Sequence, residues 1–308
     1  MTSVGTPLVW GLFATVVLLA LAVDLGLVNR QARELRMREA GVWVAIWVLL
    51  AAGFNAYVMH RFGTAKGLEF TQGYLLELAL STDNLFVFIL IFSYFRVPPA
   101  FQHRVLFWGI LGAVLTRGAF IEAGAAAIHR FHWILYGLGA LLFYAAFKIV
   151  FQKDAEIDPS RNPVLRLFRR LVPVADDESG PHFTVRRQGK LLATPLLAVL
   201  IVVEAVDVTF AIDSIPAIFG VTTDVFIVLT SNVFAILGLR SLFFLVSGLA
   251  QKLAYLNYGI AAVLAFIGAK IMVAPFVTLP VSLSLGIVLG VLVLAIVASL
   301  AVRQRLSK

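Results

Sequence analysis

The sequence contains no cysteine, and only 14% of its 308 residues are charged. The absence of cysteine excludes disulfides, thiol redox chemistry and thiolate metal sites in this chain. Any metal that the chain handles must therefore bind oxygen or imidazole ligands. No Lys or Arg precedes the first apolar run, so this run does not resemble a signal peptide with its charged n-region. We expect it to be a retained membrane helix.

The scarcity of charge accompanies a large apolar excess. Apolar residues make up 61% of the chain, whereas soluble domains contain about 45–50%. This composition predicts an all-α polytopic membrane protein. We expect nine transmembrane helices, at residues 7–28, 41–59, 73–95, 104–127, 132–151, 194–219, 223–247, 254–274 and 281–302. The chain then divides into spans 1–5 (residues 1–151), a cytoplasmic linker (152–192) and spans 6–9 (193–308).

The basic residues predict the orientation of the chain. Alternate loops carry 19 Lys and Arg residues in one set and 3 in the other. Because cytoplasmic loops are enriched in positive charge, we expect the N-terminus outside and the C-terminus inside, in the inner (plasma) membrane of a cell. The same placement accounts for the net charge of +8, so the lipid bilayer is the expected partner and nucleic acid is not. The sequence carries no signal for the oligomeric state.

The linker is the only sizeable polar part of the chain. We expect a solvated connector rather than a regulatory domain, because linkers of this composition usually only connect. Its last residues predict a small β-hairpin that turns at Gln188 and Gly189. Thr194 and Pro195 then predict an N-cap and a first helical residue at the start of span 6.

Two of the predicted spans carry a pair of acidic residues six positions apart. Span 6 reads VLIVVEAVDVTFAIDSIPAIFG and carries Glu204, Asp207 and Asp213. An acid at the centre of a membrane helix costs roughly 2.5–3.5 kcal/mol on insertion scales. Span 3 contains LLELALSTDNLF, in which Glu77 and Asp83 have the same spacing of six residues as Asp207 and Asp213. These acids need a positively charged partner inside the membrane, and a transported cation would supply one.

Spans 3–5 are repeated as spans 6–8. After the acid pair, each copy has an arginine in its next span and a Tyr-Gly pair followed by lysine in its third. The matching residues are Arg117 and Arg240, Tyr136-Gly137 and Tyr258-Gly259, and Lys148 and Lys270. Span 3 enters from outside and span 6 from inside, so the copies are inverted. Inverted repeats are typical of alternating-access transporters, whose site lies where the repeats meet.

The acid-bearing spans offer a set of oxygen ligands, which suits Mg²⁺, Ca²⁺ or Mn²⁺ without choosing among them. The candidate metal ligands are Glu77, Asp83, Asn84, Glu204, Asp207 and Asp213. The candidate supporting groups are Ser81, Thr82, Thr209, Ile212, Ser214, Pro216, Arg117 and Arg240. The alternative for each acid is an intramembrane salt bridge. Arg117 would then neutralise Glu122 or a site carboxylate, and Arg240, Lys148 and Lys270 are further candidate partners.

A spacing of six residues places Asp207 and Asp213 roughly 120° apart around a straight helix. The two acids can converge only if the helix bends or breaks between or near them. Pro216 supplies a cause, because it lacks the N–H that would bond the carbonyl of Ile212. A break of the helix at Pro216 would free this carbonyl as a further ligand, and whether the helix breaks there is the question that Pro216 raises.

At ELALSTDNLFVF and EAVDVTFAIDSIPAIFG the sequence resembles the TerC family of integral membrane proteins, and within it the Alx-like members. The resemblance extends from span 1 to GIAAVLAFIGAKIM in span 8. The family looks like part of the LysE-type transporter superfamily. Its members are linked to manganese efflux, tellurium resistance, alkaline or redox stress, and metal supply to exported metalloenzymes. The resemblance implies that the acids of the two motifs bind the ion, and it alone supplies the choice of Mn²⁺.

Three functions are compatible with these patterns. The first is export of a divalent cation, Mn²⁺ by resemblance, through alternating access, with proton exchange on a carboxylate as the coupling hypothesis. The second is a membrane scaffold or stress-response protein (tellurium resistance, redox or pH stress) without transport activity. The third is an intramembrane enzyme, but the chain has no G-x-G-D segment and no other catalytic motif. We expect no enzyme activity, no catalytic residues and no prosthetic group.

Overall fold

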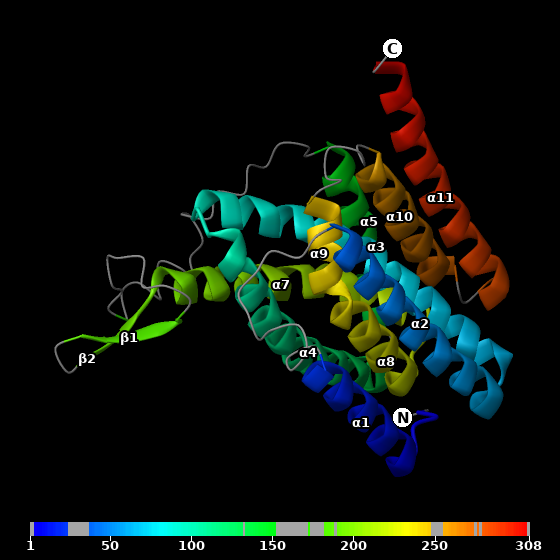
Figure 1. Ribbon diagram of the computed structural model, residues 1–308. Helices are drawn as coiled ribbons and strands as arrows, with labels where there is room; N and C mark the ends of the chain where they lie inside the picture. The colour runs from blue at the N-terminus through cyan, green and yellow to red at the C-terminus, as the bar shows by residue number, and fades with distance from the viewer. Residues whose placement is uncertain are drawn as a thin grey trace.

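A computed structural model describes residues 3–23, 37–131, 133–151, 172, 182–187, 190–247, 255–273, 276 and 279–306. These residues form helices and one two-stranded hairpin (Figure 1). In chain order they are α1 (Pro7–Val23), α2 (Met37–Phe62), α3 (Thr64–Tyr94), α4 (Pro99–Arg130), α5 (Ile134–Phe151), β1 (Thr184–Arg187), β2 (Lys190–Ala193), α7 (Pro195–Phe219), α8 (Val225–Leu237), α9 (Leu239–Ser247), α10 (Leu256–Val273) and α11 (Val281–Leu306). Figure 1 shows the hairpin at the end where α7 begins, on the side away from α11.

The described part of each predicted span lies in a helix or a helix pair, so the structure is mostly helical, as predicted. Among the described residues, five helices are long and apolar enough to cross a membrane, namely α2, α3, α4, α7 and α11. The count is six if α8 and α9, which are bent by 45° at a short break, form one span. The helices α1 and α10 contain shorter apolar stretches, Pro7–Ala22 and Tyr258–Val273. The predicted count of nine spans is therefore not confirmed.

The predicted N-cap and first helical residue of span 6 are confirmed. Before them, β1 and β2 form an antiparallel hairpin in which Arg187 pairs with Lys190; the predicted turn at Gln188 and Gly189 lies outside the described residues. Thr194 is the N-cap of α7, and its Oγ1 accepts a hydrogen bond from the backbone N–H of Leu197 at 3.4 Å. The same hydroxyl donates to the carbonyl of His182 at 2.7 Å, which ties the hairpin to the helix start. Pro195 follows as the first helical residue.

The helix does not break at Pro216. The helix α7 continues through Pro216 to Phe219 and is followed by Gly220 as its C-cap. The reason is position, because a proline in the last turn removes one backbone hydrogen bond and leaves few later turns to displace. The bend occurs instead between α8 and α9, where Gly238 ends α8. Positions 207 and 213 thus stay roughly 120° apart around one continuous helix.

The centre of the bundle is built from α3, α4, α7 and α8. The helices α3 and α7 run antiparallel. Near one end of the pair, Gly73 of α3 lies against Ile218 of α7. Near the other end, Phe88 of α3 lines the same cavity as Val203 of α7. The helix α3 also packs against α8, and α7 packs against α4. Because each central helix buries apolar residues against two or more others, polar groups on their facing sides are removed from lipid and water.

The crossing of α5 and α10 depends on two glycines. A Cβ atom at Gly268 would lie 3.0 Å from the carbonyl oxygen of Gly139, and one at Gly139 would lie 3.3 Å from that of Gly268. Small residues allow helix backbones in membranes to approach this closely. Any larger residue at either position would push against main-chain atoms, which cannot move away as a side chain can.

We predict that Gly268→Ala destabilises the protein. Overpacking of this kind costs typically about 1–3 kcal/mol, so the melting temperature of the detergent-solubilised protein should fall by several degrees. The matched control is Gly286→Ala in α11, where an added Cβ would meet no atom within 4 Å. Equal melting temperatures for the two variants would contradict a close backbone contact at the crossing.

Candidate ion-binding site

Arg117 lies at the centre of the candidate site. It is positioned by α4, and only 1% of the residue is exposed. Its Nη1 donates to Oε1 of Glu77 in α3. On the other side, Nη2 donates to Oδ1 of Asp207 in α7 at 3.1 Å, and Nε lies 3.5 Å from Oδ2. One buried guanidinium therefore joins carboxylates from two different helices. It approaches both carboxylate oxygens of Asp207 with two of its nitrogens, a bidentate arrangement.

Neutral polar groups complete the surroundings of the guanidinium. Nη1 of Arg117 lies 3.2 Å from Oγ of Ser214 in α7 and 3.4 Å from Oδ1 of Asn232 in α8. Ser81 donates its hydroxyl to Oε1 of Glu77 at 2.9 Å. All four central helices contribute to this network. A buried ion pair needs such additional hydrogen bonds, because its charges have lost the solvation of water.

Glu204 lies one helical turn before Asp207 and is half-buried. Its carboxylate packs against Gly112 of α4, at a place that a Cβ atom on Gly112 would occupy. Asn84 is buried in α3, two turns beyond Glu77. The side chains of Asp83 and Asp213 lie outside the described residues, so their predicted role as ligands stays a prediction.

The remaining predicted groups lie around this centre. The hydroxyl of Thr82 donates to the carbonyl of Leu78 at 2.8 Å, and that of Thr209 donates to the carbonyl of Ala205 at 3.0 Å, so each bonds its own helix. Thr209 is exposed, as is the side chain of Ile212. Over the part of the chain that the structure describes, no group of three or more His, Cys, Asp or Glu residues could hold a metal ion. The described site is therefore an ion-pair network rather than a formed metal centre.

The salt-bridge alternative is thus realised at Glu77 and Asp207. Arg117 pairs with these two acids, whereas Glu122 is exposed on α4. Lys270 interacts electrostatically with Glu69. The side chain of Lys148 lies outside the described residues.

Sequence reasoning missed a second polar cluster at one end of the bundle. Oε2 of Glu69 accepts hydrogen bonds from Lys66 at 2.8 Å and from the hydroxyl of Thr222 at 2.6 Å. Lys66 also lies 3.4 Å from Oδ2 of Asp224, the N-cap of α8. The cluster ties the first turns of α3 to the connection between α7 and α8. An Asp directly before the apolar run of α8 is a helix-start signal and could have indicated part of it.

Asn232 was also missed, and its only signal is a polar residue within an apolar helix.

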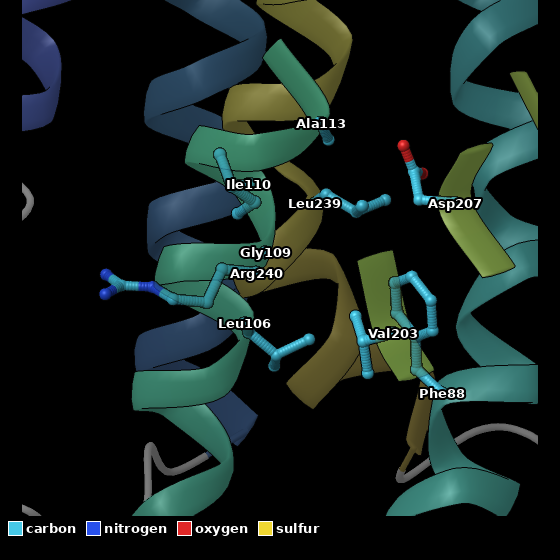
Figure 2. A pocket seen from close by; sticks show the side chains of 9 residues that line it. All are labelled: Phe88, Leu106, Gly109, Ile110, Ala113, Val203, Asp207, Leu239 and Arg240. Atoms are coloured by element: carbon cyan, nitrogen blue, oxygen red, sulfur yellow. The ribbon is translucent and has the colours of Figure 1, made fainter. Parts of the chain in front are cut away.

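A small closed cavity, with room for about one water molecule, lies beside Asp207 among the central helices. Its lining residues are Phe88, Leu106, Gly109, Ile110, Ala113, Val203, Asp207, Leu239 and Arg240 (Figure 2). The lining is apolar apart from Asp207 and Arg240. Figure 2 shows the carboxylate of Asp207 directed toward the Ala113 end, while the guanidinium of Arg240 points away from Asp207. One buried carboxylate thus borders a small space whose other walls are mainly apolar.

Fold and site together define a polytopic helical membrane protein with buried charges at the contact of its central helices. Its sequence matches the profile of the "Integral membrane protein TerC family" over residues 62–307. The chain belongs to this family, as its two acidic motifs indicated.

Relatives cover almost the whole chain. It is 49% identical over 298 residues to the "Uncharacterized membrane protein STKORF319" of Myxococcus xanthus, which covers 97% of this chain and 93% of the relative. It is 45% identical over 317 residues to the "Putative membrane-bound redox modulator Alx" of Escherichia coli strain K12, which covers 100% of this chain and 99% of the relative. No solved structure shows significant similarity to it.

We predict that Arg117→Met strongly destabilises the fold. The change leaves the buried carboxylates of Glu77 and Asp207 without their cation, and breaking a buried pair in this way costs about 3–5 kcal/mol. Chemical unfolding of the detergent-solubilised protein measures the loss. The triple variant Glu77→Gln/Arg117→Met/Asp207→Asn removes all three charges and should regain most of the stability. A triple variant as unstable as Arg117→Met would contradict this electrostatic origin.

Proposed function

We propose that the protein exports a divalent metal cation by alternating access across the membrane. The observation that carries the proposal is the meeting of two buried carboxylates from different central helices, Glu77 of α3 and Asp207 of α7, around a positive charge. Acids inside a membrane bundle are costly and typically mark ion pathways or proton relays. A small closed cavity lies beside Asp207, between the same central helices.

The packing of the helices supports an inverted repeat of α3–α5 and α7–α10. In this repeat, α3 is equivalent to α7, and α4 is equivalent to α8. A contact between α3 and α8 should then have a counterpart between α7 and α4. Both contacts are present. Equivalent positions in α3 and α7 are 130 residues apart. Residue 73 is therefore equivalent to residue 203, and residue 88 is equivalent to residue 218. The contact of Gly73 with Ile218 thus matches the approach of Val203 to Phe88. The nine spans, the outside N-terminus and membership of the LysE-type superfamily are part of this proposal.

The two ends of the central helices differ in a way that suits alternating access. Toward one end a small closed cavity lies beside Asp207, between apolar side chains. At the other, Lys66, Glu69, Thr222 and Asp224 join α3 to the connection between α7 and α8. A transporter of this kind opens one end while the other is held together. We therefore propose that the cluster around Glu69 closes the outer end in the described arrangement.

Mn²⁺ is the proposed substrate. Carboxylate, amide and hydroxyl oxygens suit Mn²⁺, Mg²⁺ and Ca²⁺ alike, and the choice of Mn²⁺ comes from the family resemblance. The name redox modulator belongs to the Alx relatives. Since this chain has no cysteine, any effect on redox balance would be indirect and could result from metal supply.

The direct experiment uses an export-deficient bacterial strain grown in excess manganese. We expect the intact chain to restore growth, and Asp83→Ala and Asp213→Ala to abolish the rescue, because each removes a proposed ligand. The matched control is Glu122→Gln, an exposed acid of α4, which should still rescue. Rescue by both alanine variants at comparable expression would show that the site assignment is wrong.

A second prediction concerns Glu204. Gly112→Ala should reduce export severalfold, because the added methyl group displaces the carboxylate of Glu204 from α4. Gly118→Ala is the matched control, since a Cβ there lies 4.0 Å from its nearest neighbour. Uptake of Mn²⁺ into inverted vesicles measures both variants, and equal loss of export in both would point to helix disturbance instead.

A scaffold or stress-response role without transport is the second candidate. The saturation of Glu77 and Asp207 by Arg117 favours it, because acids that are fully paired can serve the fold alone. The two candidates predict different effects of removing Asp83 or Asp213. Loss of export with intact expression and folding supports transport, whereas loss of folding supports the scaffold.

A further inference from the structure

We propose that Arg117 is an internal counter-cation that exchanges with the transported ion. Its guanidinium occupies, between Glu77 and Asp207, the place that the divalent ion takes in the loaded protein, and its return to the two acids expels the ion. This inference rests on the proposed function and adds to it a residue that determines ion release. It requires that Arg117 and the ion compete for the same carboxylates.

The charges of the network make a permanent cation necessary. Glu77 and Asp207 are both buried, and together with Arg117 they carry a net charge of −1. Two buried carboxylates without a cation would be strongly destabilising. A divalent ion in place of the guanidinium would neutralise the pair, and the guanidinium holds it together after the ion has left. The site is then occupied by a positive charge throughout the cycle.

A small closed cavity lies beside the network, at the carboxylate of Asp207. On α4 the lining positions Leu106, Ile110 and Ala113 follow one helix face, and Arg117 is the next position on that face, four residues after Ala113. All residues that line the cavity are buried, so the proposed exchange requires the central helices to open. An ion that then reaches Asp207 from this side must displace Nη2 and Nε of Arg117 from its carboxylate.

Neutral acceptors offer the guanidinium a second position. Ser214 and Asn232 lie 3.2 and 3.4 Å from Nη1, so they can hold Arg117 when the acids bind the ion. The helix itself is adaptable here, because the hydroxyl of Thr116 bonds the carbonyls of Gly112 and Ala113. Such bonds from threonine to its own helix are often associated with helix bending.

The test is rescue of an unstable variant by the ion. Arg117→Met is purified in detergent, and its melting temperature is measured with and without MnCl₂. If Mn²⁺ can replace the guanidinium, it should raise the melting temperature of Arg117→Met by about 5 °C or more, and by much less in the unchanged protein. The dissociation constant for Mn²⁺ should fall at least about tenfold in the variant, because its carboxylates are no longer occupied. An arginine that only holds the helices together would give no rescue.

Two further variants make the result specific. The triple variant Glu77→Gln/Arg117→Met/Asp207→Asn lacks both acids and should gain no stability from Mn²⁺. Arg117→Lys keeps the charge on a single ammonium group, which cannot form the bidentate contact to Asp207. It should therefore bind Mn²⁺ with an affinity between those of the unchanged protein and Arg117→Met.

The outcomes separate this inference from the proposed function. If the unchanged protein moves Mn²⁺ into proteoliposomes but Mn²⁺ neither stabilises Arg117→Met nor binds it more tightly, the exchange is wrong and export stands. An unchanged protein that neither binds nor transports Mn²⁺ overturns the proposed function itself. If Arg117→Met folds neither with nor without Mn²⁺ during expression and purification, the ion does not replace the guanidinium and the exchange is wrong.

Discussion

The burial of one positive and two negative side chains in an apolar bundle is the constraint on which the structure depends. Arg117, Glu77 and Asp207 come from three helices, and all three are buried. Their mutual attraction offsets the loss of solvation only if the three helices keep their relative positions. The network thereby fixes the register of α3, α4 and α7, and the same charges that hold the centre together are those that a cation would contact.

Much of the fold could be predicted because its signals are local. Apolar runs located each of the described helices. Thr194 with Pro195 located the start of α7, since an N-cap and a first-turn proline act within a few residues. The acids in spans 3 and 6 were recognisable because an acid in an apolar run is rare. Sequence reasoning also named Arg117 as a partner for a site carboxylate.

The remainder depended on contacts between helices, which the sequence does not encode locally. Nothing near Arg117 indicates that its guanidinium joins Glu77 and Asp207 rather than Glu122 on its own helix. Pro216 raised the question of a break in α7, and the helix continues through it because a proline near a helix end disturbs only the last turn. The cluster around Glu69 combines residues from distant segments, and each of them alone resembles an ordinary residue at a helix end.

The crossing of Gly139 and Gly268 has a mechanical consequence. Most packed helices interlock by side chains, so a change in their crossing angle requires ridges to leave grooves. At this crossing, main chain lies against main chain, and side chains beside the two glycines, among them Leu142, Phe143 and Met272, also pack across it. A change in the crossing angle would have to move these side chains, so α5 and α10 are expected to move together as one unit.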